Sequence, residues 1–285
     1  MSLSYQRISK ALGATVTGFQ PQLLSNPGAL DDMYSALIEH QLLVIPNARL
    51  SPAGLQRLGS AFGPVTNDHH AYQSHPDADA VVVLEWGGPN RPDAAEWHAD
   101  MTYRSSPPFA SVLQAEVIPP IGGDTLWASM YSVYDSLSPQ LQAELDELEA
   151  VHDMGAFRTP AYRAGGLSAM VDALASAGTA VHPVVAVHPA TGRRYLNVSE
   201  SFTRFVVGLS APESARLLTM LFDAINRPEH HTRLCWQSGT IAIWDNRATQ
   251  HYAIADYLPH RRVMYRVAVA TDRRGLSALD EAQAG

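Results

Sequence analysis

Two residues that could bind a metal ion lie close together in the segment Trp97-His98-Ala99-Asp100, and a third, His251, follows about 150 residues later. Side chains two positions apart on a β-strand point to the same face. A strand over this segment would therefore present the imidazole of His98 and the carboxylate of Asp100 to one ion, and His251 would complete the ligand set. The chain has twelve histidines, so the spacing alone is not specific.

Two histidines and one carboxylate leave several coordination positions of an octahedral Fe(II) open, which is the arrangement found in non-haem oxygenases. The same three ligands with one water could instead bind zinc and support hydrolysis. A third possibility is a non-catalytic binding module of cupin-like fold whose metal site is vestigial. The ligand types by themselves leave these three hypotheses open.

Composition excludes several other classes of function. The formal net charge is -8 and no block of Lys and Arg stands out, so we expect no nucleic-acid partner. Cys235 is the only cysteine, which rules out an intramolecular disulfide and a thiolate zinc site. Lys10 is the only lysine, so Schiff-base chemistry would depend on that residue. No signal peptide or membrane-spanning run is apparent, and we expect a cytoplasmic homo-oligomer, either a dimer or a tetramer.

The spacing of apolar residues predicts many short strands interrupted by a few helices. A helix over 27–41 should lead into a buried strand over 42–45, and Ser51-Pro52 should begin a second helix that ends before Gly63-Pro64. Further helices are expected from Ser138-Pro139 through Leu148, and over 167–177 and 210–225. The other expected strands are 81–84, 97–100, 111–118, 124–128, 181–187, 194–198, 234–236, 240–244 and 262–270.

These elements predict one domain over 1–285, mainly β with flanking helices, in which a double-stranded β-helix forms a jelly-roll, cupin-like barrel. There is no βαβ alternation and no GxGxxG motif, which removes the main support for a dinucleotide-binding fold. On the last expected strand Arg262, Met264 and Arg266 share a face, so two arginines should point inward. Buried cations need anionic partners, which a ligand could supply.

Four blocks of sequence resemble the taurine dioxygenase (TauD/TfdA) family of Fe(II)- and 2-oxoglutarate-dependent oxygenases. They are WHADMTY at 97–103, PPIGGDTLWAS at 119–129, HPVVAVHPATGRRYL at 182–196 and WDNRATQHYAIADYLPHRRVMYRV at 244–267. The blocks stand in the family's order and the resemblance spans nearly the whole chain. It implies that His98, Asp100 and His251 are the iron ligands.

The same resemblance implies how the co-substrates bind. 2-Oxoglutarate would chelate the iron, and Arg262 would hold its far carboxylate with help from the hydroxyl of Thr125. A guanidinium suits this task because it donates two parallel hydrogen bonds and stays charged when buried. Trp97 is expected to pack against the ligand strand. Asp245 and Asn246 are expected to stabilise the turn that presents His251.

For the prime substrate, the resemblance implies that Arg266 grips a small anion, a taurine-like sulfonate or a sulfate ester being favoured over a carboxylate such as a phenoxyacetate or an amino acid. The other substrate-side candidates are His69, Tyr72, Met101 and Phe157. The pocket departs from the family pattern, since Ala94 replaces an asparagine, Ala186 replaces an arginine and NVSESF replaces VNEGF. Substrate choice should depend on loops at 66–75, 86–96 and 154–180.

The chemistry implied is oxidation of a substrate C–H bond, coupled to conversion of 2-oxoglutarate and O2 into succinate and CO2. Hydroxylation beside the heteroatom of a sulfonate or sulfate ester would release an aldehyde with sulfite or sulfate. Asp100 occupies the carboxylate position, which disfavours a halogenase. Desaturation and cyclisation stay open as outcomes, because these reactions share the hydrogen abstraction and differ only in the later fate of the substrate radical.

Overall fold

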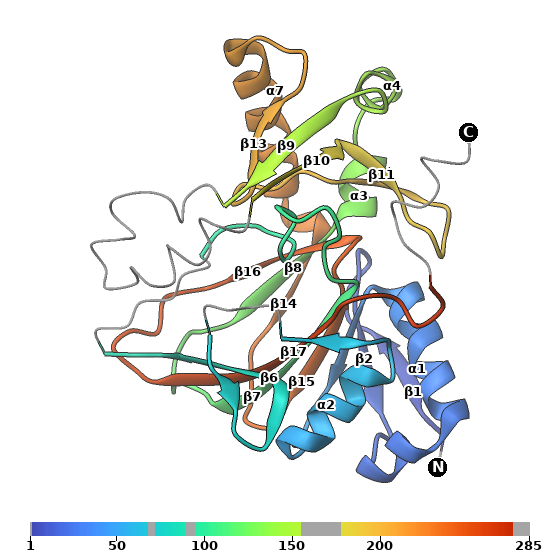
Figure 1. Cartoon of the computed structure of the whole chain (residues 1–285), viewed down its shortest axis with the longest axis vertical. Helices are drawn as coiled ribbons and strands as arrows, with labels where there is room; N and C mark the ends of the chain where they lie inside the picture. Colours follow the sequence, from blue (N-terminus) through green and yellow to red (C-terminus); the bar gives the residue numbers. More distant parts are fainter. Residues whose placement is uncertain (1, 68–71, 89–94, 155–177, 276–285) are drawn as a thin grey trace.

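The computed structural model describes residues 2–67, 72–88, 95–154 and 178–275, and its centre consists of two β-sheets that face each other (Figure 1). The larger sheet has nine strands in the order β1-β2-β3-β15-β7-β17-β6-β5, with β4 paired to β17. The smaller sheet has the order β14-β8-β16. Except for the parallel pair β2 and β3, the strand pairs of both sheets are antiparallel.

The strands of the larger sheet are β1 Ser4–Arg7, β2 Ala14–Thr17, β3 Leu42–Ile45, β4 Val65–Thr66, β5 Ser74–His75, β6 Ala78–Trp86, β7 Ala110–Val117, β15 Ile241–Asp245 and β17 Arg262–Val269. Those of the smaller sheet are β8 Thr125–Ser129, β14 His231–Leu234 and β16 Thr249–Ala253.

Successive side chains on a strand point to opposite faces of the sheet, and this alternation divides the core into two layers. On β3, Leu43 and Ile45 pack with helices α1 Pro27–His40 and α2 Pro52–Ser60, which cover the outer face of the larger sheet. Leu42 and Val44 point the other way and join the cluster between the sheets. The ring centroids of Trp127 on β8 and Trp244 on β15 lie 5.7 Å apart within that cluster. The inner face of the larger sheet is therefore where side chains from both sheets meet.

A third group of elements packs around its own apolar cluster, in the upper part of Figure 1. It contains the sheet β10-β9-β13, the hairpin of β11 and β12, and three helices. Their bounds are β9 Glu149–Asp153, β10 Thr179–Pro183, β11 Val185–Val187, β12 Arg194–Leu196, β13 Thr203–Val206, α3 Met130–Asp135, α4 Pro139–Leu145 and α7 Ala211–Ile225. The described residues also include short 3-10 helices at Pro21–Ser25 and Pro228–His230.

Helix boundaries follow the local capping signals. Asn26 accepts a hydrogen bond from the backbone N–H of Ala29 at the start of α1, and Ser51 does the same for Gly54 at the start of α2. Pro27 and Pro52 occupy first-turn positions where their missing N–H costs nothing. In the described part of the chain, no helix combines the length and the apolar character needed to cross a membrane.

Most expected elements are present, but no strand forms over 97–100 and three other elements differ. The predicted strand over 181–187 is two strands, β10 and β11, which pair in different sheets. The strand expected at 234–236 occurs earlier, as β14. Helix α4 ends at Leu145, short of Leu148, because the backbone turns into β9 soon afterwards. The helix expected over 167–177 lies outside the described residues.

Candidate active site

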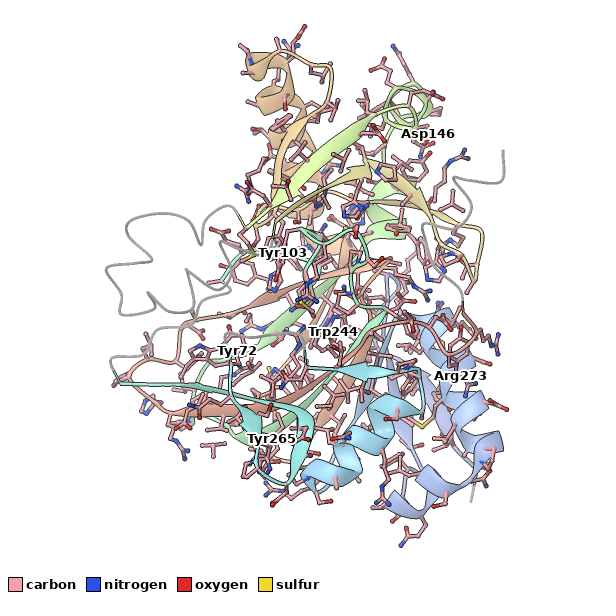
Figure 2. All side chains as sticks on the ribbon, viewed as in Figure 1. Tyr72, Tyr103, Asp146, Trp244, Tyr265 and Arg273 are labelled. Carbon is pink, nitrogen blue, oxygen red and sulfur yellow. The ribbon has the colours of Figure 1, made fainter. Side chains whose placement is uncertain are left out.

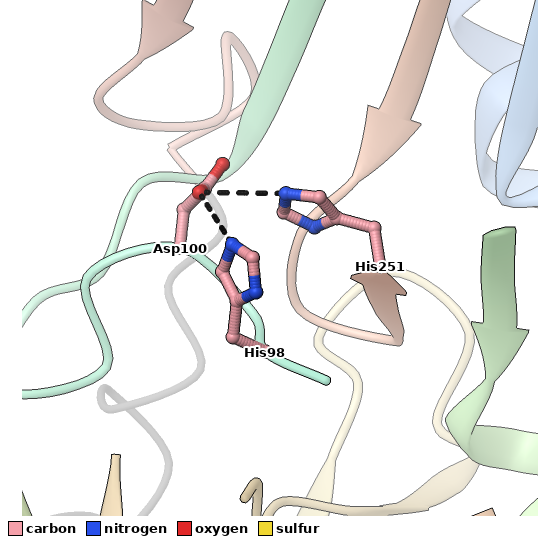
Figure 3. A group of neighbouring side chains, drawn as sticks. All are labelled: His98, Asp100 and His251. Atoms are coloured by element: carbon pink, nitrogen blue, oxygen red, sulfur yellow. Dashed lines mark ion pairs between the residues drawn. The ribbon is translucent and has the colours of Figure 1, made fainter. Parts of the chain in front are cut away.

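His98, Asp100 and His251 come together in the structure (Figure 3). Oδ1 of Asp100 lies 3.9 Å from Nε2 of His98 and 3.8 Å from Nε2 of His251. The three potential ligand atoms all lie within 4.8 Å of one another, and the three side chains are at most 12% exposed. One oxygen and two nitrogens thus face a common point, as a single ion would require.

The prediction that His98 and Asp100 share a strand is wrong. His98 forms an isolated bridge with His251, through backbone hydrogen bonds of 3.1 Å and 2.8 Å, and the chain turns at Asp100. Met101, next in the chain, has a left-handed φ of 54°, which is uncommon for a residue with a side chain. The turn, rather than strand alternation, brings the carboxylate to the same point as the two imidazoles.

Asn246 holds this turn in place. Its Oδ1 accepts a 2.7 Å hydrogen bond from the backbone N–H of Asp100, and its Nδ2 donates to the carbonyls of Asp100 and Pro108. Asp245 stabilises the turn before β16, the strand of His251, as expected. Its carboxylate accepts a hydrogen bond from the backbone N–H of Arg247 in that turn. Asn246 therefore supports the turn that presents Asp100 rather than the turn that presents His251.

The surroundings keep the imidazoles neutral and the carboxylate ionised. Burial lowers the pKa of His98, and burial together with the neighbouring His98 lowers the pKa of His251 to about 3. Burial acts to raise the pKa of Asp100, but Arg266, the two histidines and a hydrogen bond from Ser111 outweigh it and hold that pKa below its ordinary value. Deprotonated nitrogen and oxygen donors are the form in which these residues bind metals.

The tautomer of His98 also suits metal binding. Its Nδ1 lies 2.8 Å from the carbonyl oxygen of Glu96, and because a carbonyl only accepts, Nδ1 carries the proton. Nε2 is then left with its lone pair facing Asp100 and His251. A metal-binding histidine is commonly oriented in this way by a second hydrogen bond.

A cavity of about 110 Å³ opens beside His98, Asp100 and His251. Its wall is mostly apolar and aromatic, and Asp100 is the only carboxylate among the described residues that line it. Figure 2 labels three of the lining residues, Tyr72, Tyr103 and Trp244. The full lining is Tyr72, Leu84, Trp86, His98, Asp100, Met101, Tyr103, Leu113, Thr125, Met154, Ser201, Phe202, Trp244, His251, Ala253, Arg262 and Arg266.

Arg262 and Arg266 both line this cavity from β17, which confirms the expected inward face. Arg262 is 3% exposed, and no described carboxylate forms an ion pair with it. Its Nε has no hydrogen-bond partner among the described residues, and burial lowers its pKa. Trp86 and Tyr257 surround the guanidinium with ring centroids 5.9 and 5.8 Å away. A cation buried in this way suits an anionic ligand.

Arg266 lies next to the three candidate metal ligands. Its Nη2 is 2.9 Å from Oδ2 of Asp100, the carboxylate oxygen that does not face the histidines. Within the described residues, Nε and Nη2 of Arg266 make no well-aligned hydrogen bond. The guanidinium therefore contacts Asp100 while retaining donors for a ligand in the cavity.

The other sequence candidates divide into three groups. Thr125 lines the cavity, and its Oγ1 accepts a 2.9 Å hydrogen bond from Nε1 of Trp236, so its own proton can be donated elsewhere. Tyr72 and Met101 also line the cavity. His69 and Phe157 lie outside the described residues, as does the substituted position Ala94.

Trp97 is buried and packs against Tyr252 and His231, with its Nε1 donating to Asn226, as expected for a packing residue.

Several lining residues were not predicted. Tyr103 belongs to the block WHADMTY, and Ser201 and Phe202 belong to NVSESF, whose departure from the family pattern was the one available signal. Met154 follows β9 and begins the loop over 154–180 that was expected to influence substrate choice, although the residue itself was not singled out. Each of these comes from the third group of elements or from the turn after Asp100, so their approach depends on how the layers pack.

Comparison with known proteins gives consistent matches over nearly the whole chain. Residues 4–268 match the family model described as taurine catabolism dioxygenase TauD, TfdA family. An alkylsulfatase from Acinetobacter baylyi is 30% identical over 94% of this chain and 85% of its own length. An alpha-ketoglutarate-dependent sulfate ester dioxygenase from Pseudomonas putida is 29% identical over 95% of this chain and 90% of its own.

Among solved structures, a taurine dioxygenase from Burkholderia xenovorans superposes with a TM-score of 0.81 at 30% sequence identity. The match covers 97% of this chain and 94% of the other. This likeness confirms the predicted class of fold, a mainly β jelly roll with flanking helices.

Proposed function

The chain belongs to the taurine catabolism dioxygenase TauD, TfdA family, and we propose that His98, Asp100 and His251 hold the Fe(II) that this family requires. The protein is accordingly a 2-oxoglutarate-dependent dioxygenase (alpha-ketoglutarate is the older name), with O2 as second co-substrate. When bound, iron and the co-substrates supply the oxidising power for attack on a substrate C–H bond, and 2-oxoglutarate ends as succinate and CO2. The two neutral imidazoles and the ionised carboxylate fit this ion.

Arg262 is the proposed anchor for the far carboxylate of 2-oxoglutarate. The support for this role is a buried guanidinium on β17 that has an unused Nε donor and no described carboxylate in ion-pair contact. Thr125 would add a hydroxyl donor, because its oxygen already accepts from Trp236. Fixing one end of the co-substrate in this way orients its other end toward the ligand group.

Arg266 is the proposed anchor for an anionic prime substrate. The proposed class of substrate rests on one observation, which is that the cavity combines a cationic group with an apolar wall. A guanidinium with unused donors lies beside a wall of Met101, Tyr103, Met154 and Phe202. An organic sulfate or sulfonate with an apolar chain satisfies both parts, whereas the ammonium group of taurine would find no described carboxylate other than the ligand Asp100. His69 and Phe157 remain proposed substrate contacts.

We therefore favour an alkyl sulfate ester or alkylsulfonate as substrate, oxidised at the carbon next to the heteroatom. A hydroxyl group placed on that carbon makes the C–O bond to sulfate, or the C–S bond to sulfite, break with formation of an aldehyde. The residues' part is to hold the anion at Arg266 so that this carbon, rather than a more distant one, lies nearest the metal. The alternative substrate is an aryloxy carboxylate, since Phe202, Tyr103 and Trp86 could also pack against an aromatic ring.

Succinate release with a matched panel of substrates tests this proposal. The Fe(II)-loaded protein would be supplied with O2, 2-oxoglutarate and either hexyl sulfate, hexanesulfonate, taurine, hexanoate or phenoxyacetate. We expect the six-carbon sulfate or sulfonate to give the most succinate, with an equal amount of aldehyde and of sulfate or sulfite. A preference for taurine would contradict the assignment of a substrate with an apolar chain. A preference for phenoxyacetate would support the alternative substrate, an aryloxy carboxylate.

An Arg266→Met variant makes the test specific to the anion site. Loss of a buried charge pair should raise the KM for hexyl sulfate by roughly 30-fold or more. Arg261→Met is the matched control, because Arg261 is 60% exposed and pairs with Glu85. Equal effects of the two changes would remove the support for Arg266 as the substrate anchor.

We also propose that the protein acts in the cytoplasm as a homo-oligomer, a dimer or a tetramer. A single cysteine in the sequence is compatible with a reducing compartment. Sedimentation analysis of the purified chain would determine the oligomeric state, and a monomer at micromolar concentration would contradict this part.

A further inference from the structure

Asp100 offers its two carboxylate oxygens to different partners. Oδ1 faces the two histidine nitrogens, at 3.9 and 3.8 Å. Oδ2 faces away and accepts a 2.8 Å hydrogen bond from Oγ of Ser111, with Nη2 of Arg266 at 2.9 Å. Arg266 contributes charge at this oxygen without a well-aligned hydrogen bond, so the directional contact comes from Ser111.

Ser111 is well placed to fix that carboxylate. It lies on β7, whose neighbours β15 and β17 pair with it on both sides, opposite Trp244 and Ala268. It is 0% exposed and shares the inner face of β7 with Leu113 and Ala115, which belong to the apolar cluster between the sheets. A buried hydroxyl is costly unless it is hydrogen-bonded, and in this apolar row Asp100 is the acceptor that satisfies it.

We propose that Ser111 is a positioning residue for the metal centre, which holds Oδ2 of Asp100 so that Oδ1 alone is presented to the ion. This inference rests on the metal role of Asp100 in the proposed function. Ser111 does not line the cavity, whereas Arg266 does and is the proposed substrate anchor. When a substrate anion shares the guanidinium of Arg266, the hydrogen bond from Ser111 remains and keeps the carboxylate oriented.

Metal affinity, measured without any substrate, tests the inference. Mn(II), a redox-stable substitute for Fe(II), would be titrated into the metal-free protein, with free Mn(II) followed by electron paramagnetic resonance. Removing a hydrogen bond to a metal ligand typically weakens metal binding 10- to 100-fold, so we expect Ser111→Ala to raise the Mn(II) Kd roughly tenfold. A Kd within about twofold of wild type would overturn the inference.

Ser129→Ala provides the matched control. Ser129 is also a buried serine on a strand, but its hydroxyl donates to Oε1 of Gln41, at 2.7 Å. This variant should lose stability while its Mn(II) Kd stays within about twofold of wild type. Thermal unfolding with and without Mn(II) separates the two effects, because the metal should stabilise Ser129→Ala as much as wild type and Ser111→Ala less.

If Ser111→Ala does not fold, Ser111→Cys takes its place, since a thiol fills the position with a somewhat larger atom and is a weaker donor. We expect its Mn(II) Kd to exceed that of wild type by more than about twofold, and a smaller change overturns the inference. Failure of the inference about Ser111 can be told apart from failure of the proposed function. Wild-type protein that binds Mn(II) but releases no succinate with the substrate panel would refute the proposed function and leave the role of Ser111 standing.

Discussion

Replacing Arg262 with methionine should weaken 2-oxoglutarate binding while leaving the fold intact. The guanidinium is 3% exposed, and its proposed partner is the far carboxylate of the co-substrate. Loss of one member of a buried, hydrogen-bonded charge pair costs about 2–5 kcal/mol. Taking about 3 kcal/mol, the Kd for 2-oxoglutarate should rise roughly 100-fold.

The same change should not destabilise the ligand-free protein. There the Arg262 charge is buried without a described carboxylate in ion-pair contact, and burial already lowers its pKa. Methionine is similar in length and flexible, so it can occupy the space between Trp86 and Tyr257. We expect the metal-free variant to unfold at a temperature no lower than wild type.

Anaerobic titration of the Fe(II)-loaded protein measures the binding, because chelated 2-oxoglutarate gives a weak visible charge-transfer band. Titration with 2-oxobutyrate, which lacks the far carboxylate, provides an internal comparison. Wild type should distinguish the two acids strongly and Arg262→Met only slightly. Arg261→Met, a change of the exposed neighbour that pairs with Glu85 at 2.7 Å, should leave both affinities nearly unchanged.

Binding of 2-oxoglutarate by Arg262→Met within about threefold of wild type would refute the role of Arg262 as the anchor. Discrimination between the two acids as strong as in wild type would refute it too, since the loss of affinity would then not involve the far carboxylate.

Three further changes probe other parts of the molecule. Asn246→Ala removes three buried hydrogen bonds, two to the backbone of Asp100 and one to the carbonyl of Pro108, so the free energy of unfolding in urea should fall by about 3 kcal/mol; a loss below about 1 kcal/mol would contradict the role of Asn246 in holding the turn. His98→Ala should abolish Mn(II) binding in the paramagnetic resonance titration, and retained micromolar affinity would contradict its role as a ligand. His152→Gln should make stability less dependent on pH in acid. Burial, reinforced by His182 and Arg204, lowers the pKa of His152 from 6.5 to about 3.

The sign of the pH effect is set by proton uptake. Between pH 6.5 and about 3 the unfolded chain binds a proton at His152 that the folded chain does not, so acid favours unfolding. His152 alone should account for about 3 kcal/mol of the stability lost between pH 6.5 and about pH 4. Urea unfolding at several pH values measures this slope, and an identical slope in wild type and His152→Gln would be inconsistent with a depressed pKa.

The sequence by itself determined the elements whose pattern is local. Strand β3 and helices α1 and α2 were predicted to within about two residues, because their signals act within a few positions: an apolar run over 42–45, helical spacing of apolar residues over 27–41, and the cap at Ser51-Pro52. The inward face of β17 was predicted from strand alternation, and the types of the three potential ligands could be read directly.

Only the tertiary structure decided how the three candidate ligands meet. The turn at Asp100 depends on Asn246, far along the chain, and the left-handed Met101 carries no sequence signal such as glycine. Strands β9, β13 and β16 are short and partly polar, so their pairing is set by neighbouring strands rather than by their own residues.

The contact of Ser111 with Asp100 is likewise decided only by the tertiary structure. In sequence it is one polar residue at the start of an apolar strand, and nothing local relates it to Asp100. The contact exists because β7 runs between β15 and β17 in a register that points Ser111 at the carboxylate. Local patterns encode the period of a strand, whereas contacts between distant residues depend on sheet order and register, which the packing of the whole core selects.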